Sequence, residues 1–249
     1  MLEGHIRTMP LAARTLACVA VAAALFAALI VLVDRPLARY CNQNSFAIYD
    51  AASAVSALGE AAWYLVPALL VFLIARFIVR RPAIAARGLF VFLGVALAGL
   101  AADVLKVVVG RSRPWVLFAH GRYDLFWPLR LDADYQSFPS GHAACAIAAA
   151  LTLAVLAPRY RLQLLLAGSL IALTRVVLVA HYLSDVLAGA ALAWLIVVTL
   201  ERAFARQGVP LGPVDDAAAR LLPSPLALRV FGALRLYARA PGIPRSASR

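Results

Sequence analysis

Charged residues are scarce in this chain of 249 residues. Aspartate, glutamate, lysine and arginine together make up 14% of the sequence, whereas 64% of the residues are hydrophobic and the mean hydropathy is +0.86. Because a soluble domain usually carries roughly 25% charged residues, this composition excludes a single soluble domain of this length. It is typical of a protein that crosses a membrane several times.

Cysteine is also rare, and its three positions, Cys18, Cys41 and Cys145, show neither metal-binding nor disulfide spacing. Cys18 and Cys145 lie in apolar segments, where we expect small core residues, and Cys41 has no obvious partner. The sequence therefore shows no candidate metal site. Lysine is rarer still, since Lys106 stands alone beside 23 arginines, and we attribute this bias to genome composition.

Six apolar stretches are long enough, or nearly so, to cross a bilayer core that needs about 20 helical residues. They lie at Thr15–Val33, Ala61–Val79, Gly88–Val109, Ala143–Ala157, Leu162–Ala180 and Val186–Leu200, of which the fourth is the shortest. We therefore predict an all-α fold, a six-transmembrane-helix bundle with short extramembrane helices, as one domain over residues 1–201. Residues 202–249 are predicted to form a basic cytoplasmic tail with an amphipathic helix beginning near Ser224.

The first stretch could be mistaken for a secretory signal, because Arg7 and Arg14 precede it. Its 19 uncharged residues, however, exceed the roughly 7–15 apolar residues usual in such signals, so a retained helix is favoured.

Arginines divide unequally between the two sides of the predicted bundle. With the N-terminus inside, sixteen arginines fall in cytoplasmic segments and six in the two larger outer loops. This bias follows the positive-inside rule and predicts cytoplasmic termini, with Lys106, His142 and His181 at the outer face. The net charge of +12 does not indicate nucleic acid, because anionic lipid headgroups account for arginines spread over inner-face loops.

The two outer loops differ in character. Apolar residues in Asp34–Glu60 fit a short helix on the membrane surface, and a loop packed over the helix ends fits equally well. The loop Gly110–Phe138 carries seven aromatic residues among charged ones. These aromatics can anchor the loop at the membrane interface or form a lid over a lipid headgroup, and both interpretations stay open.

Three short motifs at the ends of apolar stretches combine groups that can bind and cleave a phosphate ester. In the first, Lys106 and Arg113 are seven residues apart, two turns if the helix continues, and Pro114 ends it. Arginine offers a planar fork for phosphate oxygens and lysine a compact point charge. The alternative is a pair of cations that reach to the membrane interface.

The second motif, Pro139-Ser140-Gly141-His142, predicts a turn that opens a helix. Backbone N–H groups at a helix start bind anions, and glycine lets the backbone come close to them. Ser140 can cap the helix or donate to a phosphate oxygen, and His142 can protonate a leaving alkoxide.

The third motif comprises Thr174-Arg175, His181 and Asp185. At a separation of four residues, one helical turn, Asp185 can hold one imidazole nitrogen of His181 and present the other as a nucleophile. Arg175 adds a third cation. The alternative is a structural pair between Arg175 and Asp185.

In order and spacing these motifs resemble the type 2 phosphatidic acid phosphatase (PAP2) superfamily, which also includes vanadium haloperoxidases. The pattern Lys-x6-Arg-Pro, Pro-Ser-Gly-His and Ser/Thr-Arg-x5-His-x3-Asp matches at every position over residues 106–185. The six-helix layout extends the resemblance over about residues 12–201.

The resemblance implies roles for these residues. His181 is expected to be the nucleophile that forms a phosphohistidine, Asp185 to orient it, and His142 to act as general acid and then to activate water. The phosphate is expected to be held by Lys106, Arg113, Ser140, Gly141 and Arg175. No metal or other cofactor is implied. Asp103 lies outside the pattern, and we expect it to face Lys106 or Arg175.

The resemblance thus implies a metal-independent hydrolase of lipid phosphoric monoesters or diphosphates, with its site on the outer side of the bacterial inner (cytoplasmic) membrane. Expected partners are the membrane and a lipid phosphate, without nucleic acid; the oligomeric state stays open. Candidate substrates are undecaprenyl diphosphate, lipid A 1-phosphate, phosphatidylglycerophosphate and phosphatidic acid, because the motifs bind the phosphoryl group common to all four.

Two other functions compete with this one. A haloperoxidase-like enzyme could use the same pocket for vanadate, but such relatives are typically soluble. A non-catalytic phospholipid-binding or carrier protein would need only the cations, so two histidines and Asp185 argue against it.

Overall fold

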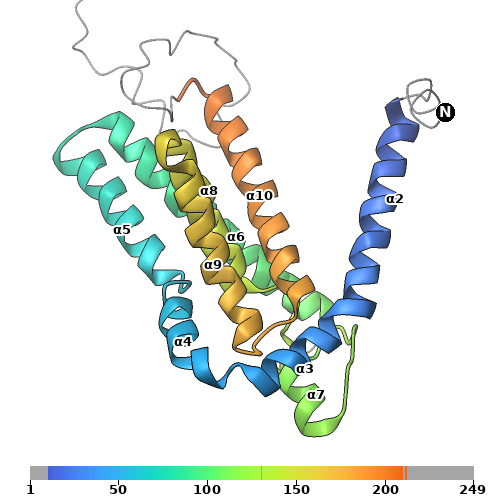
Figure 1. Ribbon diagram of the computed structural model, residues 1–249. Helices are drawn as coiled ribbons and strands as arrows, with labels where there is room; N and C mark the ends of the chain where they lie inside the picture. Colours follow the sequence, from blue (N-terminus) through green and yellow to red (C-terminus); the bar gives the residue numbers. More distant parts are fainter. Residues whose placement is uncertain (1–10, 130, 210, 212–249) are drawn as a thin grey trace, which may run out of the picture.

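The computed structural model describes residues 11–129, 131–209 and 211, and all regular structure in these residues is helical (Figure 1). The predicted all-α class is confirmed for this part of the chain, whereas the predicted tail helix after Ser224 lies outside it. The α-helices are α2 (Leu11–Leu29), α3 (Arg35–Asn44), α4 (Tyr49–Ala57), α5 (Ala62–Leu73), α6 (Pro82–Val109), α7 (Pro114–His120), α8 (Gly141–Leu156), α9 (Arg161–Val177) and α10 (Leu183–Arg206). Short π turns and 3-10 turns connect or extend them: η1 (Ile30–Asp34), η2 (Phe46–Ile48), η3 (Ile74–Ile78), η4 (Ala133–Tyr135) and η5 (Pro158–Tyr160).

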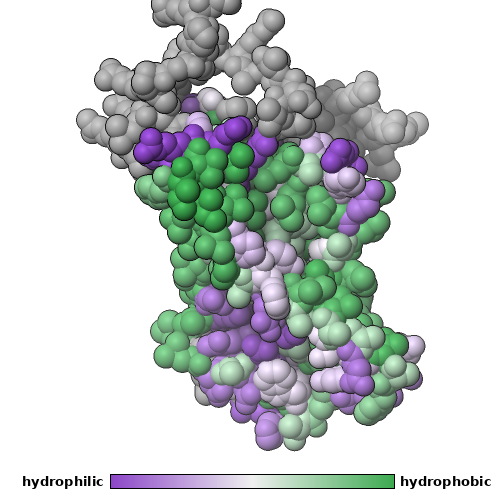
Figure 2. Space-filling model, turned by 90° about the vertical axis from the view of Figure 1, so that its left-hand side faces the viewer, coloured by the Kyte–Doolittle hydropathy of each residue, from purple (hydrophilic) through white to green (hydrophobic). Residues whose placement is uncertain are grey.

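Five helical segments among the described residues are long and apolar enough to cross a membrane, so the chain is multi-pass. They are Thr15–Asn44, Phe46–Ile78, Pro82–His120, Pro158–Val177 and Leu183–Arg206. The stretch predicted as a fourth span corresponds to α8, which is apolar but only 16 residues long. In Figure 2 hydrophobic side chains form a broad region between hydrophilic side chains toward the two ends of the visible face.

Helix α8 lies within the bundle and packs against α6, α9 and α10. Its buried face consists mainly of small side chains, among them Ala143, Ala144, Ala146, Ala148, Ala149, Ala150 and Ala154. Small residues let helices in a membrane approach closely. The alanine-rich sequence therefore explains how α8 can contact three neighbours at once.

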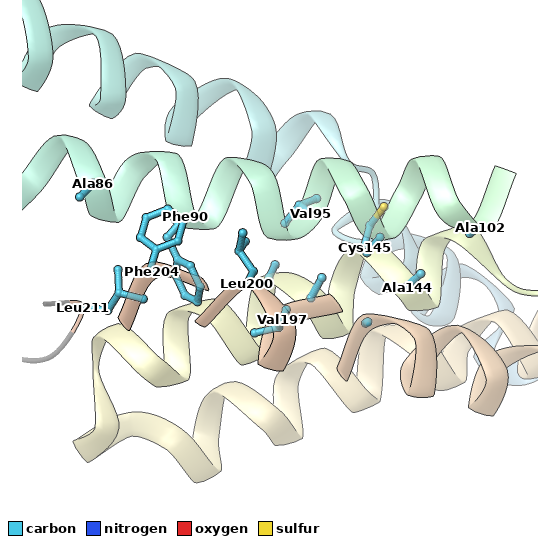
Figure 3. Close-up of a cluster of buried hydrophobic side chains, with 14 residues drawn as sticks. Ala86, Phe90, Val95, Ala102, Ala144, Cys145, Val197, Leu200, Phe204 and Leu211 are labelled. Atoms are coloured by element: carbon cyan, nitrogen blue, oxygen red, sulfur yellow. The ribbon is translucent and has the colours of Figure 1, made fainter. Parts of the chain in front are cut away.

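The main hydrophobic core joins α6, α8 and α10 (Figure 3). Phe90 of α6 and Phe204 of α10 meet edge to face, with ring centroids 5.4 Å apart. Ala102 and Ala144 continue the core toward the other end of the same helices. We call this other end of the bundle the site end, because Lys106 lies there, one turn beyond Ala102. The core thus fixes the helix ends that carry the polar motifs.

Helix α2 stands away from the other long helices in Figure 1, and none of its most apolar 18-residue window is buried. It meets the rest of the chain near the site end, where Phe26 contacts Phe138 edge to face at 6.2 Å. Cys18 is consequently exposed, and its prediction as a core residue is wrong, whereas Cys145 is buried as predicted.

Both predicted outer loops contain helices at the site end. The first forms α3 and α4, and both contact α9. The second forms α7 and η4. The first loop is therefore helical, and it packs against α9, the helix that carries Arg175 of the third motif.

Candidate active site

The three sequence motifs come together at the site end of the bundle. The His142 imidazole lies within electrostatic range of four other predicted site residues, which are Lys106, Arg113, Arg175 and His181. His142 belongs to the first turn of α8, and the other four come from the ends of α6, α7, α9 and α10. A cluster of three permanent cations and two histidines results, and such a cluster favours an anionic ligand.

The helix that carries Lys106 does not continue to Arg113, so the condition for their two-turn spacing is not met. Helix α6 ends at Val109 because Gly110 is left-handed (φ 64°) and donates its N–H to the Lys106 carbonyl. Only glycine fits there, since a Cβ would lie 1.7 Å from the Trp127 carbonyl oxygen. Arg113 is extended, as a residue before proline prefers, and it caps the start of α7. It therefore reaches the site from a second helix.

The arginine of the first motif is also held by the aromatic loop. Arg113 donates from Nε to the Ala133 carbonyl at 3.0 Å and lies over the Trp115 ring at 4.8 Å. The Trp115 indole in turn donates to Asp134 at 2.8 Å. These contacts use Nε and one face of the guanidinium, so its two terminal nitrogens are left for a phosphate.

The second motif opens helix α8 as predicted. Ser140 is the N-cap, and its Oγ accepts the Ala143 N–H at 3.4 Å. The Ser140 N–H donates to the Asp185 carbonyl at 3.0 Å, which fixes the turn against the start of α10. A Cβ on Gly141 would lie 3.0 Å from Lys106 Nζ. Glycine at this position therefore lets the ammonium group approach the positive end of α8.

Lys106 Nζ lies 3.0 Å from Asp103 Oδ1, so the expectation that Asp103 faces Lys106 is confirmed. Asp103 is largely exposed, with 70% of its side chain accessible, whereas Lys106 is 14% accessible. The aspartate therefore lies at the rim, and the ammonium group points inward.

Helix α4 lies against the third motif, and the sequence did not predict this contact. Ser56 accepts a hydrogen bond from Arg175 Nη1 at 2.8 Å, and a Cβ on Gly59 would lie 3.3 Å from the His142 ring. Arg175 Nε is buried and has no hydrogen-bond partner among the described residues. A buried donor without an acceptor is uncommon, and an anion in the site would satisfy it.

The Nδ1 atom of His181 is held by the Ser137 carbonyl, whereas the spacing had suggested the Asp185 carboxylate. Nδ1 lies 2.8 Å from the Ser137 carbonyl oxygen and 3.8 Å from Asp185 Oδ2. Because a carbonyl only accepts, Nδ1 carries the proton and Nε2 carries the lone pair. Burial lowers the pKa of the His181 imidazole, and the Asp185 carboxylate opposes this effect. The neutral ring is the form that a nucleophile needs.

His181 and Asp185 are neighbours through a helix cap and not through a helical turn. Helix α10 begins only at Leu183, and the Tyr182 N–H donates to Asp185 Oδ2 at 2.9 Å. The same oxygen accepts from Ser137 Oγ at 2.6 Å. Ser137 thus contacts both members of the pair, His181 by its carbonyl and Asp185 by its hydroxyl.

The other oxygen of Asp185 accepts from Arg111 Nη1 at 2.6 Å. Arg111 Nη2 donates to Asp34 Oδ2 and to the Tyr123 hydroxyl, each at 2.9 Å. Ser184 completes the set, because its hydroxyl bonds to Arg111 and to Asp34. The alternative pairing of Arg175 with Asp185 is wrong, since Arg111 takes that place.

Sequence reasoning missed Arg111 and Asp34, although both are at least 98% buried. A signal was present, because each is a charge at the edge of an apolar stretch, where ionisable groups are costly. Among the described residues, no three histidine, cysteine, aspartate or glutamate side chains come close enough to hold a metal ion.

Comparison with known proteins agrees with these motifs. The family model of the PAP2 superfamily matches residues 87–208. A Rhizobium johnstonii protein named lipid A 1-phosphatase is 37% identical over 145 residues, which are 58% of this chain and 56% of that protein. A Rhizobium etli protein of the same name is 29% identical over 210 residues, 80% of this chain and 87% of that protein. The match thus spans little more than half of the first relative, and no solved structure matches the chain.

Proposed function

Because the chain belongs to the PAP2 superfamily, we propose that it is a membrane lipid phosphatase that acts through a phosphohistidine on His181. The observation that carries the proposal is the hydrogen bond from His181 Nδ1 to the Ser137 carbonyl. This hydrogen bond places the proton on Nδ1 and leaves the lone pair on Nε2. The ring is then neutral, and it belongs to the cluster that contains three cations. A protein that only bound phosphate would not need this arrangement.

In the first proposed step, Nε2 of His181 attacks phosphorus and the P–O bond to the lipid breaks as the P–N bond forms. Lys106, Arg113 and Arg175 neutralise the phosphate oxygens, together with the N–H groups at the start of α8. His142 gives its proton to the leaving oxygen. In the second step, His142 takes a proton from water, whose oxygen attacks phosphorus as the P–N bond to His181 breaks, and inorganic phosphate is released.

Metal independence is part of the proposal. The three cations supply the positive charge that phosphoryl transfer requires. The two buried carboxylates nearby, Asp34 and Asp185, are both bound to Arg111 and are not arranged as an open ligand set.

Lipid A 1-phosphate is the leading substrate candidate, because both relatives bear a name with that activity. The other candidates are undecaprenyl diphosphate, phosphatidylglycerophosphate and phosphatidic acid. We further propose that α8 is the sixth span, since an even number of spans puts both termini on one side. The arginine bias supports a cytoplasmic position for both termini and, with it, a site at the outer face of the inner membrane.

The test is phosphate release by the purified protein in detergent from each of the four lipids. We expect turnover of at least one lipid, and none when His181→Ala is used. The matched control is His120→Ala, which removes an exposed histidine at the end of α7. Full activity in His181→Ala, or no release from any of the four lipids by the unaltered protein, would overturn the proposal.

A further inference from the structure

An open polar pocket lies at the site end of the bundle, and none of its lining residues belongs to the three motifs. It has a volume of about 330 Å³ and lies between α3 and α7, which are neighbours at the site end in Figure 1. Its polar wall consists of Arg35, Arg39, Asn42 and Gln43 from α3. Leu117 and Phe118 of α7 form its apolar wall.

The four polar residues lie on one face of α3, because positions 35, 39, 42 and 43 recur at helical spacing. The other face is buried through Ala38 and Cys41. Cys41 packs in a cluster with Val176 of α9 and Val186 of α10. Helix α3 is therefore fixed on the bundle, and its polar face is held toward α7.

The positive charge of the pocket is not balanced by a carboxylate from the described part of the chain. Neither Arg35 nor Arg39 forms an ion pair with a carboxylate among the described residues. The described contact of the Arg35 guanidinium is with the Tyr123 ring, at 5.2 Å from its centroid. Asn42 and Gln43 add amide groups, and no carboxylate lines the pocket. This set of groups fits an anionic, hydroxyl-rich ligand.

The pocket is physically joined to the active site by two routes. Helix α7 carries Arg113 at its start and Leu117 one turn later, about 6 Å along the axis. By the second route, the Tyr123 ring under Arg35 bears the hydroxyl that accepts from Arg111, and Arg111 binds Asp185. The pocket and the candidate active site therefore share one helix and one hydrogen-bonded network.

We propose that this pocket binds a second phosphate of a glycolipid substrate while the first phosphate lies against His181. The inference rests on the proposed function and adds a specificity to it, since Arg35 and Arg39 would favour lipids whose sugar headgroup bears two phosphates. Phosphatidic acid, with its single phosphate, cannot occupy both sites at once. The competing explanation is that both arginines contact membrane headgroups in general.

The test compares two disaccharide lipids that differ in one group: one carries a phosphate on each sugar, and the other only the phosphate to be cleaved. In the double variant Arg35→Gln/Arg39→Gln, we expect KM for the bisphosphorylated lipid to rise by roughly tenfold, the order of a lost charged hydrogen bond. Its kcat and both constants for the monophosphorylated lipid should stay unchanged. Arg159→Gln/Arg161→Gln at the opposite end is the matched control.

An equal rise in KM for both lipids would show that the two arginines contact headgroups in general. An unchanged KM for both would show that the pocket binds neither lipid. Either result overturns the inference. A binding measurement separates it from the proposed function. Protein carrying His181→Ala should bind the bisphosphorylated lipid more tightly than the monophosphorylated one, and the double arginine variant in the same background should abolish that preference. If the unaltered protein cleaves neither of these lipids nor any of the other three candidate substrates, the proposed function fails, and the binding preference alone decides whether the pocket recognises the second phosphate.

Discussion

Arg111 Nη1 and Asp185 Oδ1 are joined by a buried hydrogen bond of 2.6 Å, although 74 residues separate them in the chain. Through this bond Asp185, which was predicted to orient His181, is tied to the loop after α6. Arg111 also binds Asp34 at the end of η1. One guanidinium therefore holds together three segments that are distant in sequence.

Replacing Arg111 should destabilise the fold. Arg111→Gln leaves two buried carboxylates without a counter-ion, and removal of one partner of a buried ion pair costs about 3–5 kcal/mol. We expect a markedly lower midpoint of thermal unfolding in detergent. The matched control Arg122→Gln removes a half-exposed arginine paired with Asp124, and should change the midpoint little. Equal midpoints for the two variants would contradict the role assigned to Arg111.

The effect of His142→Ala should depend on the leaving group. Loss of a general acid commonly costs about 10²–10⁴ in rate, and the cost is smaller when the leaving oxygen needs less protonation. We therefore expect a milder loss of kcat on a lipid diphosphate than on a lipid monophosphate, measured by phosphate release. His181→Ala should abolish release from both. An identical fractional loss on the two lipids in His142→Ala would argue against the acid role.

The protonation of His181 can be observed directly. Since burial lowers the pKa of its imidazole, the ring should stay neutral as the pH falls from 7 through the ordinary histidine value of about 6.5. Its proton should lie on Nδ1, which donates to Ser137. Nitrogen NMR of protein with ¹⁵N-labelled histidine reports both properties, and His181→Ala assigns the signal. A charged ring at pH 7, or a proton on Nε2, would exclude the proposed nucleophile.

Activity should survive chelation of divalent metal ions. Charge neutralisation is assigned to Lys106, Arg113 and Arg175, so phosphate release in excess EDTA should equal that in untreated protein. Vanadate should inhibit as a phosphate mimic that accepts the histidine nitrogen as a fifth ligand. Loss of release on chelation, with recovery on adding one divalent ion, is the result that would refute metal independence.

The orientation of the site can be tested with introduced thiols. After Cys18, Cys41 and Cys145 are replaced, Ala119→Cys at the exposed end of α7 should react with an impermeant thiol reagent in intact spheroplasts. Ala83→Cys, exposed at the opposite end in the first turn of α6, should react only after the membrane is opened. The reverse pattern would place the chemistry in the cytoplasm.

The sequence predicted the residues of the site better than their geometry. Charged groups at the edges of apolar stretches identified Lys106 and Arg175, because such groups are costly near a bilayer. The spacing argument failed for Arg113, since α6 ends at Gly110, a left-handed glycine of the kind that commonly ends helices. The contact of this glycine with the Trp127 carbonyl, 17 residues later, is tertiary and could not be predicted from local spacing.

The link between His181 and Asp185 was predicted for a reason that the structure does not support. Four residues suggested one helical turn, whereas the pair meets at a helix start and shares Ser137. Arg111 and Asp34 were missed because they are 77 residues apart and become neighbours only when the helices assemble. Local spacing thus indicated the chemistry, and tertiary contacts decided which group orients which.

The segment that carries every recognisable motif is not self-sufficient. Residues 87–208 hold the proposed nucleophile, the proposed general acid and the three cations proposed to bind phosphate. Asp34, which binds Arg111, and Ser56, which binds Arg175, both lie before that segment. A fragment limited to residues 87–208 would keep the groups proposed to react. It would lack the first two helical segments, whose Asp34 and Ser56 hold Arg111 and Arg175 in place. The N-terminal third of this chain thus supports the candidate active site through Asp34 and Ser56, besides supplying two segments long enough to cross a membrane.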